Sequence, residues 1–318
     1  MARRKPMKRF LFTAVAVFAE FLLSSSQAVT LAEYAPAHPL KLFVAARDSV
    51  MPNTTDQTNN LKEGDRALLL SGAGLTDLTG ISKLMVEDDG LRVPITSVKN
   101  LHLFFNRNEI TSIPDEIGAL KNVIFIYFEN NKLNTLPRAL MDMDSLSGMY
   151  FTANQFTEIP PFVFEMTRLR KLQFARNHLT VLPPGIGNLT RLIHFNIGEN
   201  EIAVIPETIA KLTQLRVCEL SDNRIESLPE AFGKVPILYQ LRVRNNPLTS
   251  LPAGFAAMPG TIDITGTKID LEKLPPELRA RINTEKPPKA VSNQVVKRGA
   301  KDQAATEPPD AAKQNDSK

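Results

Sequence analysis

Apolar residues recur along this chain in blocks that repeat with a fixed step of 23 residues. The block from Leu169 to Leu189 shows the pattern: apolar and polar residues alternate over a few positions, and an asparagine and a Leu-Pro pair follow. Such alternation predicts a short strand with one buried face. Its repetition at a fixed step predicts one structural unit stacked many times.

Asparagine and proline keep the same step. The asparagines are Asn108, Asn131, Asn154, Asn177, Asn200, Asn223 and Asn246, and the prolines are Pro114, Pro137, Pro160, Pro183, Pro206, Pro229, Pro252 and Pro275. Because a short amide can satisfy backbone groups where the chain leaves a strand, the asparagines are predicted to form a structural ladder between units. Each proline fixes φ and ends local pairing, which predicts an irregular return path with a short helical turn.

The unit reads LxxLxLxxNxLxxLPxxIGxL, with Phe174 at the third leucine position, and resembles the leucine-rich repeat family. The resemblance covers about residues 100–282 and is strongest to the 23-residue class with an LPxxI turn, of the exported bacterial type. It implies an α/β fold, a leucine-rich repeat solenoid. In that fold an arc carries a parallel β-sheet on its concave face and irregular or short helical segments on its convex side. It also implies protein binding through the concave face.

The pattern divides the chain into six segments. They are a signal peptide (1–28), a linker or arm (29–62), an N-terminal capping repeat with an insertion (63–100), seven regular repeats (101–259), a degenerate C-terminal repeat and cap (260–283) and a disordered tail (284–318). The signal peptide is predicted from basic residues before an apolar stretch, Phe10 to Leu23, and from small residues at Ser26 and Ala28. We therefore expect a secreted or periplasmic protein without stable membrane insertion after cleavage.

Charge argues against nucleic acid as a partner. The net charge of +4 comes from the ends: residues 1–28 hold five basic residues and one acidic, and residues 284–318 hold seven and five. Residues 29–283 hold 26 basic and 28 acidic residues. The predicted concave face carries no basic stripe, so little phosphate-neutralising attraction is expected.

Catalytic and metal-binding motifs are missing from the sequence. The single cysteine, Cys218, excludes a disulfide within the chain and a CxxC zinc site, and it occupies a buried strand position, so we interpret it as a core residue. His102 and His194 lie four units apart, about 19 Å at roughly 4.8 Å per strand, which is too far for shared chemistry. The histidines are interpreted as ordinary surface residues. We expect no enzyme activity, no cofactor and no metal.

Strand alternation assigns side chains to the concave face. Aromatic residues occupy its N-terminal third, at Phe104, Phe125, Tyr127 and Tyr150, and polar or charged residues follow at Gln173, Asn196, Glu219, Arg242 and Arg244. Contiguous exposed aromatic side chains often mark a binding site, so the first group is predicted to anchor a protein or peptide ligand and the second to orient it. The alternative is that the arm, or the insertion before Asn108, covers the aromatic residues.

Two functional hypotheses follow. The first is a non-catalytic protein-recognition scaffold that binds a protein or peptide ligand on the concave face. The second is a structural component of the cell envelope, in which the tail at 284–318 contacts an anionic polymer.

Overall fold

The computed structural model describes residues 29–38, 40–44, 62, 64–236 and 238–283. The chain divides into two units, Met1–Thr284 and Glu285–Lys318, and every described residue belongs to the first unit. The predicted signal peptide and the predicted tail lie outside the described residues.

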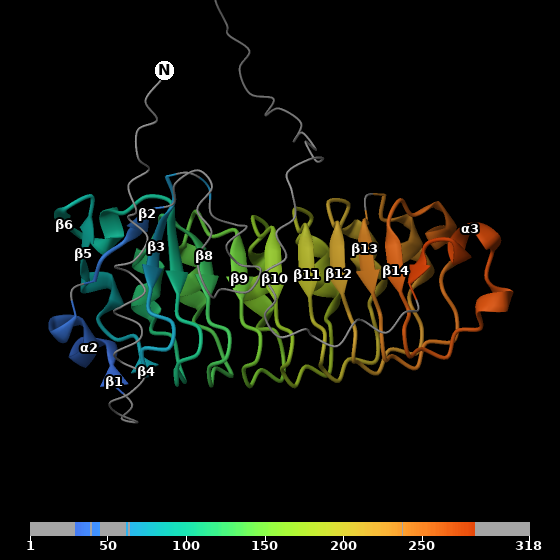
Figure 1. Cartoon of the computed structure of the whole chain (residues 1–318), viewed down its shortest axis with the longest axis horizontal. Coiled ribbons are helices and arrows are strands. Elements are labelled where there is room, and N and C mark those ends of the chain that lie inside the picture. Colours follow the sequence, from blue (N-terminus) through green and yellow to red (C-terminus); the bar gives the residue numbers. More distant parts are fainter. Residues whose placement is uncertain (1–28, 39, 45–61, 63, 237, 284–318) are drawn as a thin grey trace, which may run out of the picture. The chain divides into compact units, whose positions relative to one another are not determined.

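One sheet of 11 strands organises the described unit, and Figure 1 shows its strands side by side. In sheet order the strands are β15 (Ile282–Asn283), β14 (Thr261–Asp263), β13 (Gln240–Arg242), β12 (Val217–Glu219), β11 (His194–Asn196), β10 (Lys171–Gln173), β9 (Gly148–Tyr150), β8 (Val123–Tyr127), β7 (Leu101–Phe104), β3 (Arg66–Leu69) and β2 (Phe43–Val44). Only β2 runs antiparallel to its neighbour in this sheet. The predicted parallel sheet is confirmed.

The register of the sheet follows the sequence repeat. Lys171 lies opposite His194, and His194 lies opposite Val217, so partners in neighbouring strands are 23 residues apart. Each unit therefore adds one strand to the sheet in the same alignment as the last. Side chains that are 23 residues apart in the sequence therefore lie next to one another across the sheet.

The return paths contain short 3-10 helices that begin directly after the repeated proline. They are η4 (Asp115–Ala119), η5 (Arg138–Asp142), η6 (Pro161–Glu165), η7 (Pro184–Asn188), η8 (Glu207–Lys211), η9 (Glu230–Lys234) and η10 (Ala253–Ala257). Proline suits this position because its φ is already close to helical and its missing N–H would have no helical partner. The short helical turn predicted for the return path is confirmed.

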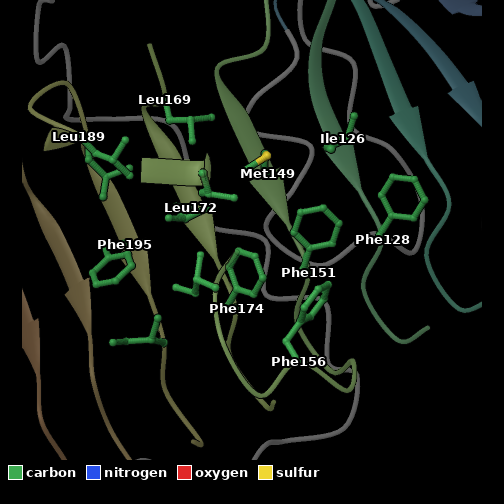
Figure 2. Close-up of a cluster of buried hydrophobic side chains, with 14 of the residues drawn as sticks. Ile126, Phe128, Met149, Phe151, Phe156, Leu169, Leu172, Phe174, Leu189 and Phe195 are labelled. Atoms are coloured by element: carbon green, nitrogen blue, oxygen red, sulfur yellow. The ribbon is translucent and has the colours of Figure 1, made fainter. Parts of the chain in front are cut away.

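The core lies between the sheet and the return paths (Figure 2). Phe128, Phe151 and Phe174 stack in successive units, with ring centroids 5.8 Å and 5.2 Å apart, and Phe156 meets Phe174 edge to face at 5.0 Å. All four are fully buried. Burial of one such side chain contributes about 1.5–3 kcal/mol, so contacts between neighbouring units account for much of the stability.

The repeated asparagines form a hydrogen-bonded ladder. Asn177 Nδ2 donates to the carbonyl of Phe151 in the preceding unit and to that of Phe174 in its own unit, each at 3.0 Å. Its Oδ1 accepts from Phe156 N at 3.0 Å. The residue before each asparagine has a positive φ of 51–57°, and these residues are Arg107, Asn130, Ala153, Arg176, Glu199, Asp222 and Asn245. The left-handed backbone conformation of this residue directs the asparagine side chain that follows it into the turn.

The first described residues form a cap rather than a linker. Helix α2 (Leu31–Ala37) starts with a capping box between Thr30 and Glu33, and Leu31 is fully buried. Strand β1 (Val29–Thr30) pairs with β4 (Leu75–Asp77). Thr30 and Glu33 satisfy the free N–H groups at the helix start, which stabilises this short helix locally. In place of the predicted linker or arm, these residues add a helix and a strand to the first unit.

The insertion of the capping repeat contains a β-hairpin. Strands β5 (Met85–Asp88) and β6 (Leu91–Pro94) pair antiparallel around Asp89 and Gly90, whose φ angles are 49° and 81°. An Asp-Gly pair favours this tight turn, because both central residues need a positive φ. Two 3-10 helices, η2 (Ile81–Lys83) and η3 (Ile95–Ser97), flank the hairpin.

The C-terminal end is closed by η11 (Leu271–Lys273) and the four-residue helix α3 (Pro276–Arg279). Leu278 of α3 is buried, and Arg279 Nε donates to the Leu274 carbonyl at 2.9 Å. Thr267 stands where earlier units have asparagine, and its hydroxyl donates to the Ile264 carbonyl at 2.8 Å. The Thr267 hydroxyl makes fewer hydrogen bonds than an asparagine amide can. A unit at the end of the stack needs fewer of them.

Candidate ligand-binding face

We call the side of the sheet that points away from the core the outer face. The central residue of each regular strand, such as Leu172 or Cys218, is fully buried in the core, so the residues on either side of it point the other way. The middle column of the outer face is Phe104, Tyr127, Tyr150, Gln173, Asn196, Glu219, Arg242 and Asp263. This is the face that the sequence analysis predicts to be concave.

The aromatic residues at the N-terminal end of this face form one packed group, the aromatic cluster: Phe104, Phe125, Tyr127 and Tyr150. The ring centroids of Phe104 and Tyr127 are 4.2 Å apart, and those of Tyr127 and Tyr150 are 4.5 Å apart. The exposed fractions of the four residues are 1, 9, 0 and 3 %, in chain order. The expectation that they are exposed is wrong.

Residues near the N-terminal edge of the sheet pack against the aromatic cluster. Ala67 of β3 is buried with it, and Phe43 of β2 and Leu69 of β3 are partly buried against it. Phe43 belongs to the segment that the sequence analysis treats as an arm, so contact between the arm and the aromatic residues, the alternative raised from the sequence, is present. This apolar surface is stabilised by packing within the chain.

Gly148 makes room for the Phe125 ring. A Cβ atom at Gly148 would overlap Cδ1 and Cε1 of that ring, so the ring lies directly over the backbone of β9. On the far side of Gly148, Lys171 Nζ lies 5.6 Å from the Phe125 centroid. The glycine therefore permits a close approach that links the aromatic cluster to the first charged residue of the outer face.

His102 is buried, and the interpretation as a surface histidine is wrong for this residue. Its exposed fraction is 0 %, its ring stacks on Phe125 at 5.1 Å, and its Nε2 lies 3.1 Å from Asp65 Oδ2. The same oxygen accepts from Lys62 N at 2.7 Å. Burial lowers the pKa of His102 to about 4, against the opposing attraction of Asp65. The histidine is therefore neutral near pH 7.

From β10 onward the outer face is half-buried, so its side chains reach solvent. Gln173, Asn196 and Glu219 all belong to this part. Glu219 Oε2 pairs with Arg242 at 3.3 Å, and Asp263 pairs with Arg244 at 3.7 Å. Each of these ion pairs favours one orientation of its charged side chains, by about 0.2–1 kcal/mol.

Hydrogen bonds to the backbone also fix the side chains of the outer face. Asn196 Oδ1 accepts from Gly198 N at 3.0 Å, and Glu219 Oε1 accepts from Ser221 N at 2.9 Å. Both side chains are therefore fixed by the turn that follows their own strand. A partner would meet a surface whose side chains are largely ordered beforehand, which lowers the entropic cost of binding.

Partial burial changes the acid–base properties of this face. Burial raises the pKa of Glu129 to about 7 despite the nearby charge of Arg107. Burial, with Arg170, lowers the pKa of Lys171 to about 8. Burial, with the positive charges of Lys171, Arg216 and Arg170, lowers the pKa of His194 to about 4. In the core, burial and then Glu219 raise the pKa of the Cys218 thiol.

The described part of the chain contains no group of three or more His, Cys, Asp or Glu side chains that could hold a metal ion. None of the helices in that part is long and apolar enough to cross a membrane.

The fold is that of a solenoid, in which stacked copies of one strand–turn–return unit share a sheet, and the comparisons with known proteins agree. A family model described as "Leucine rich repeat" matches residues 167–225. None of the curated proteins matches the chain.

Several solved structures have the same fold, and each can be aligned with more than half of this chain. Internalin C2 from Listeria monocytogenes is 20% identical over 64% of this chain and 78% of its own, with a TM-score of 0.50. Internalin inlF from the same organism is 19% identical over 72% and 67%, with a TM-score of 0.54. The ectodomain of the Arabidopsis thaliana receptor kinase GASSHO1/SCHENGEN3 is 23% identical over 72% and 30%, with a TM-score of 0.55.

The matched model, the stacked units and the asparagine ladder identify the fold. The chain folds as a leucine-rich repeat solenoid, and residues 167–225 match the family model.

Proposed function

We propose that this protein is a non-catalytic scaffold that binds a protein or peptide ligand on the outer face of strands β10 to β14. The observation that carries the proposal is the change in burial along this face. The aromatic cluster is buried, whereas the polar and charged residues beyond it are half-buried, and ion pairs join Arg242 to Glu219 and Arg244 to Asp263. An ordered, partly exposed polar surface suits recognition.

The ligand contacts proposed are Gln173, Asn196, Glu219, Arg242 and Arg244. The aromatic cluster has a different role in this proposal: it is a rigid base beside the binding surface and does not touch the ligand. Support by analogy comes from the Arabidopsis ectodomain, which was solved in complex with Casparian strip integrity factor 2. We also propose membership of the 23-residue exported bacterial class, with export through residues 1–28.

A matched pair of double variants tests the proposal. Gln173→Glu with Val217→Glu places two acidic side chains on the outer face. Val181→Glu with Val204→Glu places the same side chains at positions that are 60 % and 70 % exposed and precede the Leu-Pro or Ile-Pro steps of their units. Each purified full chain serves as bait for extracts, and captured proteins are identified by mass spectrometry. Equal thermal unfolding temperatures establish that both variants remain folded.

The expected result is one captured protein that the wild type and the second variant retain and the first variant loses. Equal capture by both variants would contradict binding on the outer face. Capture of wall polymer that disappears when residues 284–318 are deleted would instead favour the envelope hypothesis.

A further inference from the structure

Four basic or imidazole side chains gather where strands β10, β11 and β12 begin, and we call them the basic patch: Arg170, Lys171, His194 and Arg216. Lys171 and His194 are register partners in adjacent strands. The Arg170 carbonyl accepts from Ile193 N at 2.8 Å, and the Ile193 carbonyl accepts from Arg216 N at 2.9 Å. The two arginines therefore occupy the same position two units apart, on either side of His194.

The basic patch has no acidic partner within the described residues, because no ion pair there includes Arg170, Lys171 or Arg216. Some other arginines of the repeats form ion pairs with acidic side chains. Arg176 pairs with Glu199 at 3.5 Å, and Arg224 pairs with Glu201 at 2.7 Å. Single basic residues elsewhere in the described part of the chain, such as Arg191, also lack an ion pair, but in this patch the unpaired basic residues lie together and include the half-buried Lys171.

This arrangement is electrostatically unfavourable in the free protein. Lys171 and His194 are half-buried, so both lose part of their hydration. Lys171 faces the charge of Arg170, and His194 faces the charges of Lys171, Arg216 and Arg170. The lowered pKa values of both residues reflect that burial and repulsion. An anion placed among these side chains would remove the repulsion, so the free surface is arranged to favour a negatively charged ligand.

We propose that the basic patch binds an acidic segment of a peptide or protein, with carboxylates placed between Arg170 and Arg216. This rests on the proposed scaffold function and names the chemical class of its partner. Two strand steps separate the arginines, about 10 Å at roughly 4.8 Å each. Carboxylates on alternate residues of an extended peptide are about 7 Å apart, so two of them fit this span.

A long polyanion fits less well. Residues 29–283 hold 26 basic and 28 acidic residues, and on the outer face the patch is followed by Glu219 and Asp263. A nucleic acid would lose phosphate contacts as soon as it extended beyond the patch. A short acidic peptide can be neutralised within the patch itself.

Binding should strengthen at lower pH. The groups around His194 are Arg170 and Lys171 on the β10 side and Arg216 on the β12 side, all positive. A bound carboxylate offsets their repulsion and favours the imidazolium form, so binding takes up a proton. The affinity should therefore rise as the pH falls through the range in which glutamate side chains remain ionised.

The test uses the full chain and a fluorescein-labelled 12-residue peptide of alternating Glu and Ser, measured by fluorescence anisotropy. A peptide with Gln in place of Glu and a 12-nucleotide DNA strand are the comparison probes. The patch variant is Arg170→Gln with Arg216→Gln. The matched control, Arg176→Gln with Arg224→Gln, removes the same charge at exposed positions that already have acidic partners. His194→Gln removes the imidazole and so tests whether His194 takes up the proton on binding.

The Glu peptide should bind more tightly than the Gln peptide, and the patch variant should weaken it about tenfold, as expected for the loss of two partly exposed ion pairs. The control should stay within about twofold. Binding at pH 5.5 should exceed that at pH 7.5 by about threefold or more, and His194→Gln should reduce the difference to the smaller part that Lys171, with a pKa of about 8, contributes.

Three results would overturn the proposal: equal binding of the Glu and Gln peptides, equal weakening by the patch and control variants, or tighter binding of the DNA strand through the same arginines. If any of these occurs while Gln173→Glu with Val217→Glu still abolishes partner capture, the scaffold function stands and only the acidic-peptide proposal fails.

Discussion

His102 Nε2 lies 3.1 Å from Asp65 Oδ2, and both side chains are buried where the capping repeat meets the first regular repeat. Ala67 of β3 is the register partner of His102 in β7, so this contact joins two units whose connection contains the β-hairpin. Within the described residues, His102 Nδ1 has no hydrogen-bond partner. Nε2 therefore carries the proton that Asp65 accepts, and the ring is neutral.

This pair predicts a loss of stability in mild acid. The pKa of His102 is about 4 in the folded state and near 6.5 in the unfolded state, so the unfolded chain binds the extra proton between these values. Stability is fully present above about pH 6.5 and is lost as the pH falls toward 4. From pH 7 to 5 we expect a loss of about 2 kcal/mol from this group, measured by urea unfolding. His194 shifts in the same direction.

The variant His102→Gln keeps a donor for Asp65 and removes the titration. It should reduce the pH dependence between pH 7 and 5, whereas His178→Gln, at an exposed position, should leave it unchanged. Identical pH profiles for the wild type and His102→Gln would contradict the assignment of this histidine as a buried neutral group.

Substitution at Gly148 should disturb the aromatic cluster. In Gly148→Ala the new Cβ would overlap the Phe125 ring, so the ring must move, and we expect a destabilisation of about 1–3 kcal/mol. The control Gly198→Ala meets its nearest atoms at 3.3 Å and should cost less. The double variant Phe125→Leu with Gly148→Ala should lose less stability than the sum of the two single changes, because both act on one contact. Strict additivity in urea unfolding would contradict the contact.

The thiol of Cys218 should resist modification in the folded protein. It is fully buried in the core, and burial raises its pKa, so it holds its proton and is shielded from reagents. Alkylation by iodoacetamide should therefore occur only through unfolding and speed up in urea in parallel with the loss of circular dichroism. Fast alkylation without denaturant would show that β12 opens locally.

The repeat could be predicted from the sequence because one period fixes the surroundings of every unit. Leu172 and Cys218 occupy equivalent positions, so the burial of one predicts that of the other. The aromatic cluster is different, because burial on the outer face depends on residues outside the repeat, such as Phe43. Alternation alone separates the two faces of a strand, and it carries no information about what packs on the outer one.

The contact between His102 and Asp65 was not predicted, for a related reason. The two residues are 37 positions apart, across an insertion that has no period, so the 23-residue step does not align them. The signal that could have been used was Asp89-Gly90, a pair that predicts a hairpin. Recognition of the hairpin would have shown that part of the insertion pairs with itself.

The left-handed residues before the ladder asparagines predict a stabilising substitution. Ala153 has a φ of 57°, a conformation that costs an alanine roughly 1 kcal/mol and a glycine almost nothing. Glycine also gives the unfolded chain more freedom, which offsets part of the gain. Ala153→Gly should therefore be neutral or stabilise the protein by up to about 1 kcal/mol. Ala175→Gly makes the same change at a buried residue whose φ is not positive and should destabilise the protein by about 1 kcal/mol. The chemical change is identical, so a difference between the two variants that exceeds the burial of one methyl group, about 0.8 kcal/mol, reports the backbone conformation. Equal destabilisation by both variants would contradict the left-handed conformation of the residue before Asn154.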